Sequence, residues 1–228
     1  MKCDLCPRKC LVDRKKGEKG ICGQTENLKV ARAALHFWEE PCISGDAGSG
    51  AVFFSGCPLH CVFCQNENIA NGTVGKEISL ERLVDIFLEL QEKRANNINL
   101  VTPGHFVPQI VKALDQARRE GLTLPVVYNT SSYETVDTIK MLEGYVDIYL
   151  PDFKYMSPVL SKKYSHAPDY AEVAKAAIAE MVRQTGKAVF VNGDEDNLIL
   201  SGTIVRHLTL PGCMADSMQI LKYLHDTY

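Results

Sequence analysis

Short apolar stretches alternate with amphipathic stretches along the chain from about residue 51 onward. The apolar stretches are nearly continuous and rich in β-branched and aromatic residues, which is typical of parallel strands buried on both faces. Between them, apolar residues recur at helical spacing, as at Leu80, Leu83, Val84 and Phe87. The alternation predicts βα units and an α/β fold. The expected strands cover residues 51–55, 97–102, 124–129, 146–150 and 203–210.

One stretch interrupts this alternation ahead of the fifth expected strand. Residues 188–191 and 198–200 are rich in β-forming residues, and they flank an acidic tip that contains Gly193. A pair of such arms around a glycine-containing tip favours a β-hairpin. We therefore expect a hairpin inserted before the fifth strand.

The beginning of the chain has a different character from the rest. It contains Cys3, Cys6, Cys10 and Cys22 together with several glycines and basic residues, and it shows little hydrophobic periodicity. A short module with little core needs a staple. Four-cysteine sites with CxxC pairs are typical of structural zinc, although iron–sulfur clusters use similar spacing, and reduced thiols without metal are the third possibility. We predict a metal-binding module over residues 1–48 and a main domain over residues 49–228.

Composition narrows the range of partners and compartments. The chain has 228 residues, 46% of them hydrophobic, and a net charge of −3. It can therefore bury a full core, but it lacks the basic stripe with which proteins bind nucleic acid. The polar N-terminus is unlike a secretory signal, and no apolar run is long enough to cross a membrane. We expect a cytoplasmic protein with no membrane partner, in which nine cysteines serve metal or redox chemistry.

Polar residues that can carry chemistry follow each expected strand. In sheets of parallel strands the reactive side chains gather at the carboxyl ends of the strands. We therefore expect these residues to converge in space although they are far apart in sequence. They are Cys57, Cys61 and Cys64 after the first strand, Thr102 to His105 after the second, Asn129 to Ser132 after the third, Asp152 and Lys154 after the fourth, and Pro211 and Gly212 after the fifth.

The stretch FFSGCPLHCVFCQN holds Cys57, Cys61 and Cys64. Three thiolates would bind three irons of a [4Fe-4S] cluster and leave the fourth iron open to another ligand. The alternative is a zinc site completed by His60, Cys42 or Cys213. Structural zinc prefers closed sites, and a histidine that adjoins a ligand cysteine is poorly placed to share its metal.

The spacing CxxxCxxC, with the aromatic Phe63 before the last cysteine, resembles the radical S-adenosylmethionine (SAM) enzymes. The resemblance implies that the amino and carboxylate groups of SAM occupy the fourth position. An electron from the cluster then breaks the sulfonium bond and yields a 5′-deoxyadenosyl radical that abstracts hydrogen. The motifs CDLCPRKC, NINLVTP, DIYLPDFKY and RHLTLPG extend the similarity, from Cys3 to Gly212, to the pyruvate formate-lyase-activating-enzyme-like subfamily.

This resemblance implies a partial (β/α)6-type barrel that lacks its last strand, because the sequence ends at Tyr228 where the family core has a sixth strand. The open edge would need cover from the N-terminal module, a partner chain or residues beyond this sequence. The implied partners are a reductant such as flavodoxin or ferredoxin and a glycyl-radical enzyme whose glycine loses a hydrogen atom. The alternatives are a small molecule or another peptide as substrate, or a non-catalytic metal-binding interaction module.

The same resemblance assigns cofactor-binding residues. Asp152 and Lys154 match an Asp-x-Lys that helps to hold SAM, although a solvated ion pair in a loop is the alternative. The family's Gly-Gly-Glu is replaced here by a segment that begins at Thr102, which could contact the SAM amino group. Asn129 stands where a ribose-binding acid is expected and can still hydrogen-bond a hydroxyl. We expect Arg206 to lie near the carboxylate or the cluster, with a structural role as the alternative.

Several other residues have simpler expected roles. His105 either lines the substrate side or is a satisfied loop histidine. Cys42 and Cys213 are expected to be ordinary small residues, because free cysteines are often simply buried. Trp38 is expected to pack between the N-terminal module and the main domain.

Overall fold

A computed structural model describes residues 2–193 and 197–228, and within these ranges it contains one eight-stranded sheet in the order β3-β1-β2-β4-β5-β6-β8-β7. Strands β2, β4, β5, β6 and β8 run parallel, whereas β1, β3 and β7 join antiparallel. The expected α/β fold is confirmed, and the first four expected strands coincide closely with β2, β4, β5 and β6. The strands are β1 (Lys29–His36), β2 (Ser49–Phe54), β3 (Lys76–Glu77), β4 (Ile98–Val101), β5 (Val126–Thr130), β6 (Ile148–Pro151), β7 (Val189–Phe190) and β8 (Ile199–Thr203).

The helices begin and end where local signals place them. Ser79 accepts a hydrogen bond from the backbone N–H of Arg82 at 3.2 Å and caps α3, while Pro108 lies in the first turn of α4 and Gly186 ends α7. The helices are α1 (Pro41–Ser44), α2 (Glu67–Ala70), α3 (Leu80–Glu92), α4 (Val107–Arg119), α5 (Val136–Lys140), α6 (Pro158–Ser165), α7 (Tyr170–Thr185) and α8 (Met214–Thr227), with short 3₁₀ turns at Arg14–Lys16, Gly104–Phe106 and Val191–Gly193. In the described part of the chain, no helix is long and apolar enough to span a membrane.

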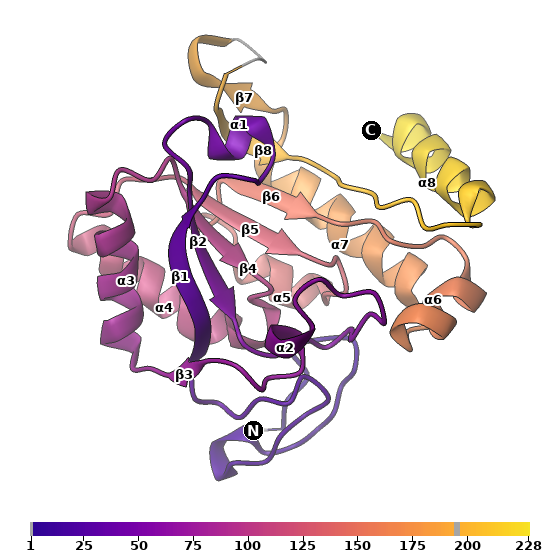
Figure 1. Cartoon of the computed structure of the whole chain (residues 1–228), viewed down its shortest axis with the longest axis horizontal. Helices are drawn as coiled ribbons and strands as arrows, with labels where there is room; N and C mark the ends of the chain where they lie inside the picture. The colour runs from indigo at the N-terminus through magenta and orange to yellow at the C-terminus, as the bar shows by residue number, and fades with distance from the viewer. Residues whose placement is uncertain (1, 194–196) are drawn as a thin grey trace.

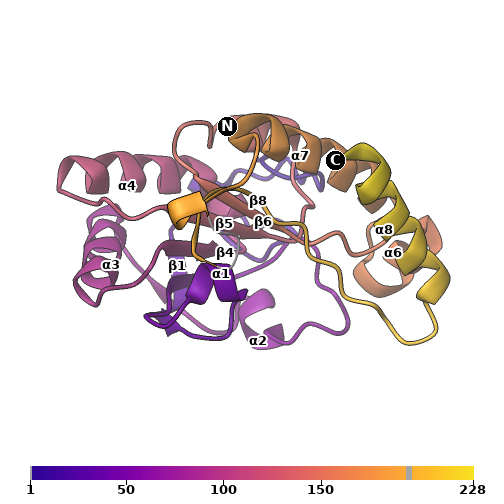
Figure 2. The same ribbon diagram turned by 90° about the horizontal axis from the view of Figure 1, so that it is seen from above.

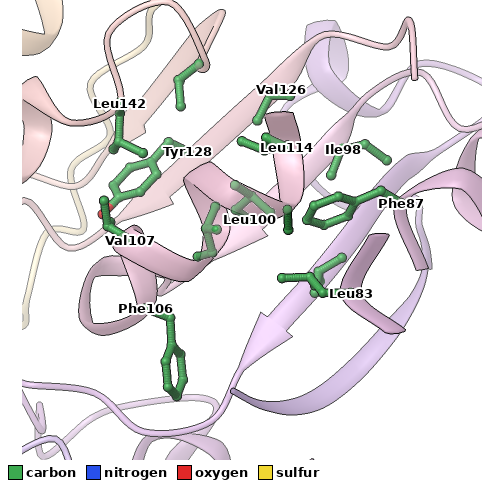
Figure 3. Close-up of a cluster of buried hydrophobic side chains, with 14 of the residues drawn as sticks. Leu83, Phe87, Ile98, Leu100, Phe106, Val107, Leu114, Val126, Tyr128 and Leu142 are labelled. Carbon is green, nitrogen blue, oxygen red and sulfur yellow. The ribbon is translucent and has the colours of Figure 1, made fainter. Parts of the chain in front are cut away.

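The face of the sheet on which α3 and α4 pack, called the outer face here, is apolar and carries the main core. Its strands contribute Leu100, Val126 and Tyr128, against which Phe87 of α3 and Leu114 of α4 pack (Figure 3). All five side chains are fully buried. The helical apolar stripes and the strand residues thus bury each other, which stabilises this face through the hydrophobic effect.

The inner face of the sheet differs because it is partly polar and is covered by α1, which lies on the opposite side from α4 and α7 (Figure 2). Ile43 of α1 is fully buried among Val127, Ile148 and Leu150. The side chains of two asparagines tie α1 to the sheet by donating hydrogen bonds, Asn97 to the carbonyl of Ile43 at 2.7 Å and Asn96 to the carbonyl of Ser44 at 2.6 Å. The segment before β2 is therefore fixed against the inner face.

The fifth expected strand lies in the wrong place. The parallel strand is β8, so the second arm of the expected hairpin is itself the fifth strand and the hairpin is not an insertion ahead of it. Residues 204–210 continue irregularly beside β6, with one isolated bridge between Asp152 and Arg206. Their apolar side chains Val205 and Leu210 pack against an apolar cluster that includes Ile220 of α8, which accounts for the strand-like pattern. The acidic residues 194–196 at the tip lie outside the described residues.

The expected cover for the open edge of the sheet was also wrong. The free side of β8 pairs with β7, so this edge is covered from within the main part of the chain. Residues of the first 48 instead extend the opposite edge, where β1 pairs with β2 and β3. Figure 1 shows β7 and α1 at one end of the sheet, and α2 with the N-terminal segment at the other.

Candidate functional site

The loop that follows β2 brings the three cysteines of the CxxxCxxC motif together. Burial, with smaller contributions from the neighbouring thiols of Cys61 and Cys64, raises the pKa of Cys57 to about 11. The three thiols therefore lie close enough for their charges to interact. The backbone N–H of Leu59 donates to the sulfur of Cys57 at 3.4 Å, and the hydroxyl of Ser165 donates to that of Cys61 at 3.1 Å. Such donors stabilise thiolates.

Lys154 and Asp152 lie beside this loop. The ammonium of Lys154 donates to Asp152 Oδ2 at 2.7 Å, and the two side chains are 17% and 24% exposed, so they are not a solvated ion pair in a loop. The Tyr170 hydroxyl accepts from the backbone N–H of Lys154 at 2.9 Å. Burial alone would lower the pKa of Lys154, but Asp152 and the thiolate of Cys61 raise it above its usual value. The pair therefore places a cation next to Cys61.

Arg206 joins the carboxyl ends of β5 and β6 to the segment between β1 and α1. Its guanidinium donates to Asp152 Oδ1 at 2.9 Å, to Asn129 Oδ1 at 2.8 Å and to Glu39 Oε1 at 2.6 Å. Asn129 in turn donates to Glu39 Oε2 at 2.8 Å. The structure thus brings together three of the residues singled out in the sequence, Asn129, Asp152 and Arg206, and adds Glu39.

Glu39 is a residue of this polar group that the sequence did not predict. It precedes β2, whereas the residues predicted for this group lie at or after the carboxyl ends of parallel strands. The rule that located those residues therefore does not apply to Glu39. Thr102 occupies a different part of the site. It lines a cavity of about 70 Å³ with Cys57 and Cys64, and its backbone N–H donates to the carbonyl of Asn129 at 2.9 Å.

The remaining candidates have structural positions. His105 is buried and its Nε2 lies 2.8 Å from the carbonyl of Ser55, and burial lowers its pKa to about 4, so it is a neutral histidine within the loop. The imidazole of His60 contacts the carbonyl of Ile21 at 2.8 Å. Trp38 is 89% exposed, so the packing expected of it between module and main domain was wrong.

The N-terminal cysteines also approach one another. Cys6 and Cys22 are buried, and burial raises the pKa of Cys6 to about 12, with a smaller contribution from Cys22 and Cys10. The pKa of Cys22 is raised by its burial and by nearby Cys3 and Cys10. The four thiols therefore lie close enough together for their charges to interact. Within residues 2–193 and 197–228, no three His, Cys, Asp or Glu side chains surround a point that could hold a single metal ion.

This N-terminal segment packs directly on the CxxxCxxC loop. The guanidinium of Arg8 donates to the carbonyl of Pro58 at 2.8 Å and to the carbonyls of Ser165 and His166 at 3.0 and 2.6 Å. It also lies over the ring of Tyr133 at 5.1 Å. One arginine therefore connects the segment that carries Cys3 to Cys22 with the loop and with the end of α6.

A buried acid lies behind the site. Glu134 accepts a hydrogen bond from Thr130 at 2.8 Å, its second oxygen is buried without a partner, and a side chain at Gly104 would collide with it. Burial raises the pKa of Glu134 to about 7. The native state then keeps a proton that the unfolded chain releases near pH 4.5.

We expect this proton to make stability depend on pH. As pH rises from about 4.5 to about 7, the free energy of unfolding should fall by an amount on the order of 3 kcal/mol, because only the native carboxyl remains protonated in this window. Urea titrations at several pH values should show this loss for the wild type and a flatter dependence for Glu134→Gln. Parallel curves for the two proteins would contradict the assignment.

The three thiols and the adjacent cation fit a [4Fe-4S] cluster with one open iron, since each thiolate binds a different corner of the cluster and the three need not surround a single ion. A parallel α/β sheet with such a loop after its first parallel strand therefore offers a place where a cluster of this kind could bind. The sequence model of the Radical SAM superfamily matches residues 51–196, more than half of the chain, and the chain belongs to this superfamily. The superfamily implies a [4Fe-4S] cluster and SAM, and an enzyme that cleaves SAM to a radical.

A relative has been recognised in an archaeon. The chain is 28% identical over 215 residues to the uncharacterized protein MJ0674 of Methanocaldococcus jannaschii. The match covers 92% of this chain and 57% of that protein, so the chain spans little more than half of the relative's length. Glu39 and Arg206 both lie outside the segment that matches the superfamily.

Proposed function

We propose that Cys57, Cys61 and Cys64 hold the [4Fe-4S] cluster and that the adjacent polar group binds SAM. The observation that carries this proposal is the placement of the Lys154–Asp152 pair beside Cys61. A bound and reduced cluster would supply the electron that splits SAM into methionine and a 5′-deoxyadenosyl radical. A buried cation attracts a carboxylate strongly, so Lys154 can receive the carboxylate of SAM, while Asp152 keeps the ammonium in place.

The substrate that we propose is a glycine in a glycyl-radical enzyme, from whose Cα the radical takes a hydrogen atom. The motifs shared with the pyruvate formate-lyase-activating-enzyme-like subfamily support this choice. We further propose that the five parallel strands form a partial barrel of the (β/α)6 type, and that a flavodoxin or ferredoxin in the cytoplasm supplies the electron. A small molecule or another peptide is the alternative substrate, and a non-catalytic metal-binding module is the alternative class.

An anaerobic assay tests the proposal in two stages. The protein is reconstituted with iron and sulfide, reduced, and mixed with SAM, and 5′-deoxyadenosine is measured by chromatography. Fully loaded iron without 5′-deoxyadenosine would reject the enzyme and favour the binding module. A candidate glycyl-radical enzyme deuterated at glycine is then added. Deuterium in 5′-deoxyadenosine and a glycyl radical signal support the proposed substrate, whereas 5′-deoxyadenosine without deuterium from any such enzyme favours the alternative substrates.

We also propose that Cys3, Cys6, Cys10 and Cys22 bind a separate metal. Zinc is the first candidate for this metal, and a second iron–sulfur cluster is the alternative. Their shared neighbourhood supports a four-thiolate site. The triple variant Cys57→Ala, Cys61→Ala, Cys64→Ala should therefore retain zinc or iron when analysed by mass spectrometry. Adding Cys22→Ser to this variant should release that metal. A triple variant with neither zinc nor iron would contradict the second site.

A further inference from the structure

Glu39 occupies an unusual position in this site because it reaches the strand ends from the segment between β1 and α1. Both of its carboxylate oxygens are engaged. Oε1 accepts from Arg206, while Oε2 accepts from Asn129 at 2.8 Å and from Asn99 at 3.2 Å. The side chain is only 12% exposed. One carboxylate thus holds donors from β4, from β5 and from the segment after β8.

The backbone around Glu39 is fixed independently of these contacts. Its N–H donates to the hydroxyl of Ser44 at 3.0 Å, and the N–H groups of Ile43 and Ser44 donate to the carbonyl of Glu40 at 2.8 and 2.9 Å. Ile43 anchors this turn in the apolar cluster of the inner face. The carboxylate of Glu39 is therefore presented by a rigid turn, which is the condition for holding other groups in a set geometry.

The two cations of the site are bound differently as a result. Arg206 forms close ion pairs with two carboxylates, Asp152 and Glu39, and also donates to Asn129. Among the described residues, Lys154 forms an ion pair with Asp152 alone. The charge of the Arg206 guanidinium is thus neutralised by two carboxylates of the protein. The Lys154 ammonium has only Asp152 among the described residues, and Asp152 also pairs with Arg206. An incoming carboxylate would meet less competition at Lys154.

We propose that Glu39 is a positioning residue for SAM binding: it holds Arg206 and Asn129 in place, so that Asp152 stays oriented and Lys154 is the cation that receives the ligand carboxylate. The inference rests on the proposed function, and it assigns a part of the site to a segment that precedes the superfamily match. Removing the negative charge of Glu39 would leave Arg206 with one close carboxylate fewer. A glutamine amide keeps only one acceptor oxygen, so either Arg206 or the amide groups of Asn99 and Asn129 would lose their acceptor.

The test compares Glu39→Gln with Glu40→Gln in the reconstituted full chain. Glu40 is the matched control because it is the adjacent acid, is 38% exposed and lies 3.9 Å from Arg206, at the limit of an ion pair. Equilibrium binding of SAM is measured by titration and by the change it causes in the electron paramagnetic resonance spectrum of the reduced cluster. We expect binding about tenfold weaker or more for Glu39→Gln and nearly unchanged for Glu40→Gln, with equal iron content and unaltered spectra before SAM is added.

A double-mutant cycle separates positioning from general stability. If Glu39 acts through Arg206, the double variant Glu39→Gln, Arg206→Gln should bind SAM about as weakly as Arg206→Gln alone. The double variant also avoids leaving an unbalanced buried charge, so it serves if Glu39→Gln alone does not fold. Wild-type affinity in Glu39→Gln, or additive losses in the cycle, would overturn the inference. Failure of the wild type to bind SAM would instead overturn the proposed function.

Discussion

Replacing Cys61 by alanine is expected to abolish the reductive cleavage of SAM. Each thiolate of the loop would bind its own iron, so two remaining cysteines leave a second iron of the cluster without a protein ligand. The side chain of Cys61 also has Lys154 and Ser165 close by, which ties the cluster to the place where SAM is proposed to bind. The measurement is 5′-deoxyadenosine formed by the reduced, reconstituted protein, together with its iron and sulfide content.

The matched control is Cys213→Ala. Cys213 is the residue before α8, and it accepts hydrogen bonds from the backbone N–H groups of Asp216 and Ser217 through its carbonyl, not through its thiol. This variant should keep the iron content and the activity of the wild type. If Cys61→Ala still produced 5′-deoxyadenosine at the wild-type rate, the loop would not hold the cluster.

The second large effect is expected for Lys154→Met, which should keep the cluster and weaken SAM binding. A charge-assisted hydrogen bond contributes roughly 1.5–3 kcal/mol, equivalent to a loss of affinity of about 10- to 100-fold. Methionine preserves the apolar part of the side chain, and Asp152 keeps its ion pair with Arg206, so the loop should remain folded. Titration of the cluster spectrum with SAM measures the loss.

Lys162→Met provides the comparison for this change. Lys162 is an exposed residue of α6, so its charge contributes little to a buried site. The SAM affinity of the Lys162→Met variant should equal that of the wild type. A Lys154→Met protein that bound SAM as tightly as Lys162→Met would remove Lys154 from the site.

The sequence predicted the parts of the molecule in which local pattern and final environment agree. Strands β2, β4, β5 and β6 are buried on both faces, so their apolar runs are continuous and easily recognised. The fifth strand was misplaced because Val205 and Leu210 of residues 204–210 pack against an apolar cluster, while only an isolated bridge at Arg206 pairs this segment with the sheet. Pattern alone does not distinguish these two causes.

The same reasoning explains which site residues were found. Asn129 lies at the carboxyl end of β5, and Asp152 and the three cysteines follow β6 and β2. The topology of the fold brings such positions together. Glu39 does not follow a parallel strand. It lies between β1 and α1, in the turn that Ile43 anchors on the inner face. Its partners are therefore set by tertiary packing, which leaves no periodic signal in the sequence.

The contacts of Arg8, Glu39 and Arg206 have a consequence for how this protein can be divided. All three lie outside residues 51–196, yet Arg8 holds the cysteine loop and the other two complete the polar group beside it. A fragment cut at the borders of the superfamily match would lose these side chains and uncover carbonyls and carboxylates that they now satisfy. The segment that defines the family is thus not a transplantable unit, and exchanging it between relatives would require its flanking segments to travel with it.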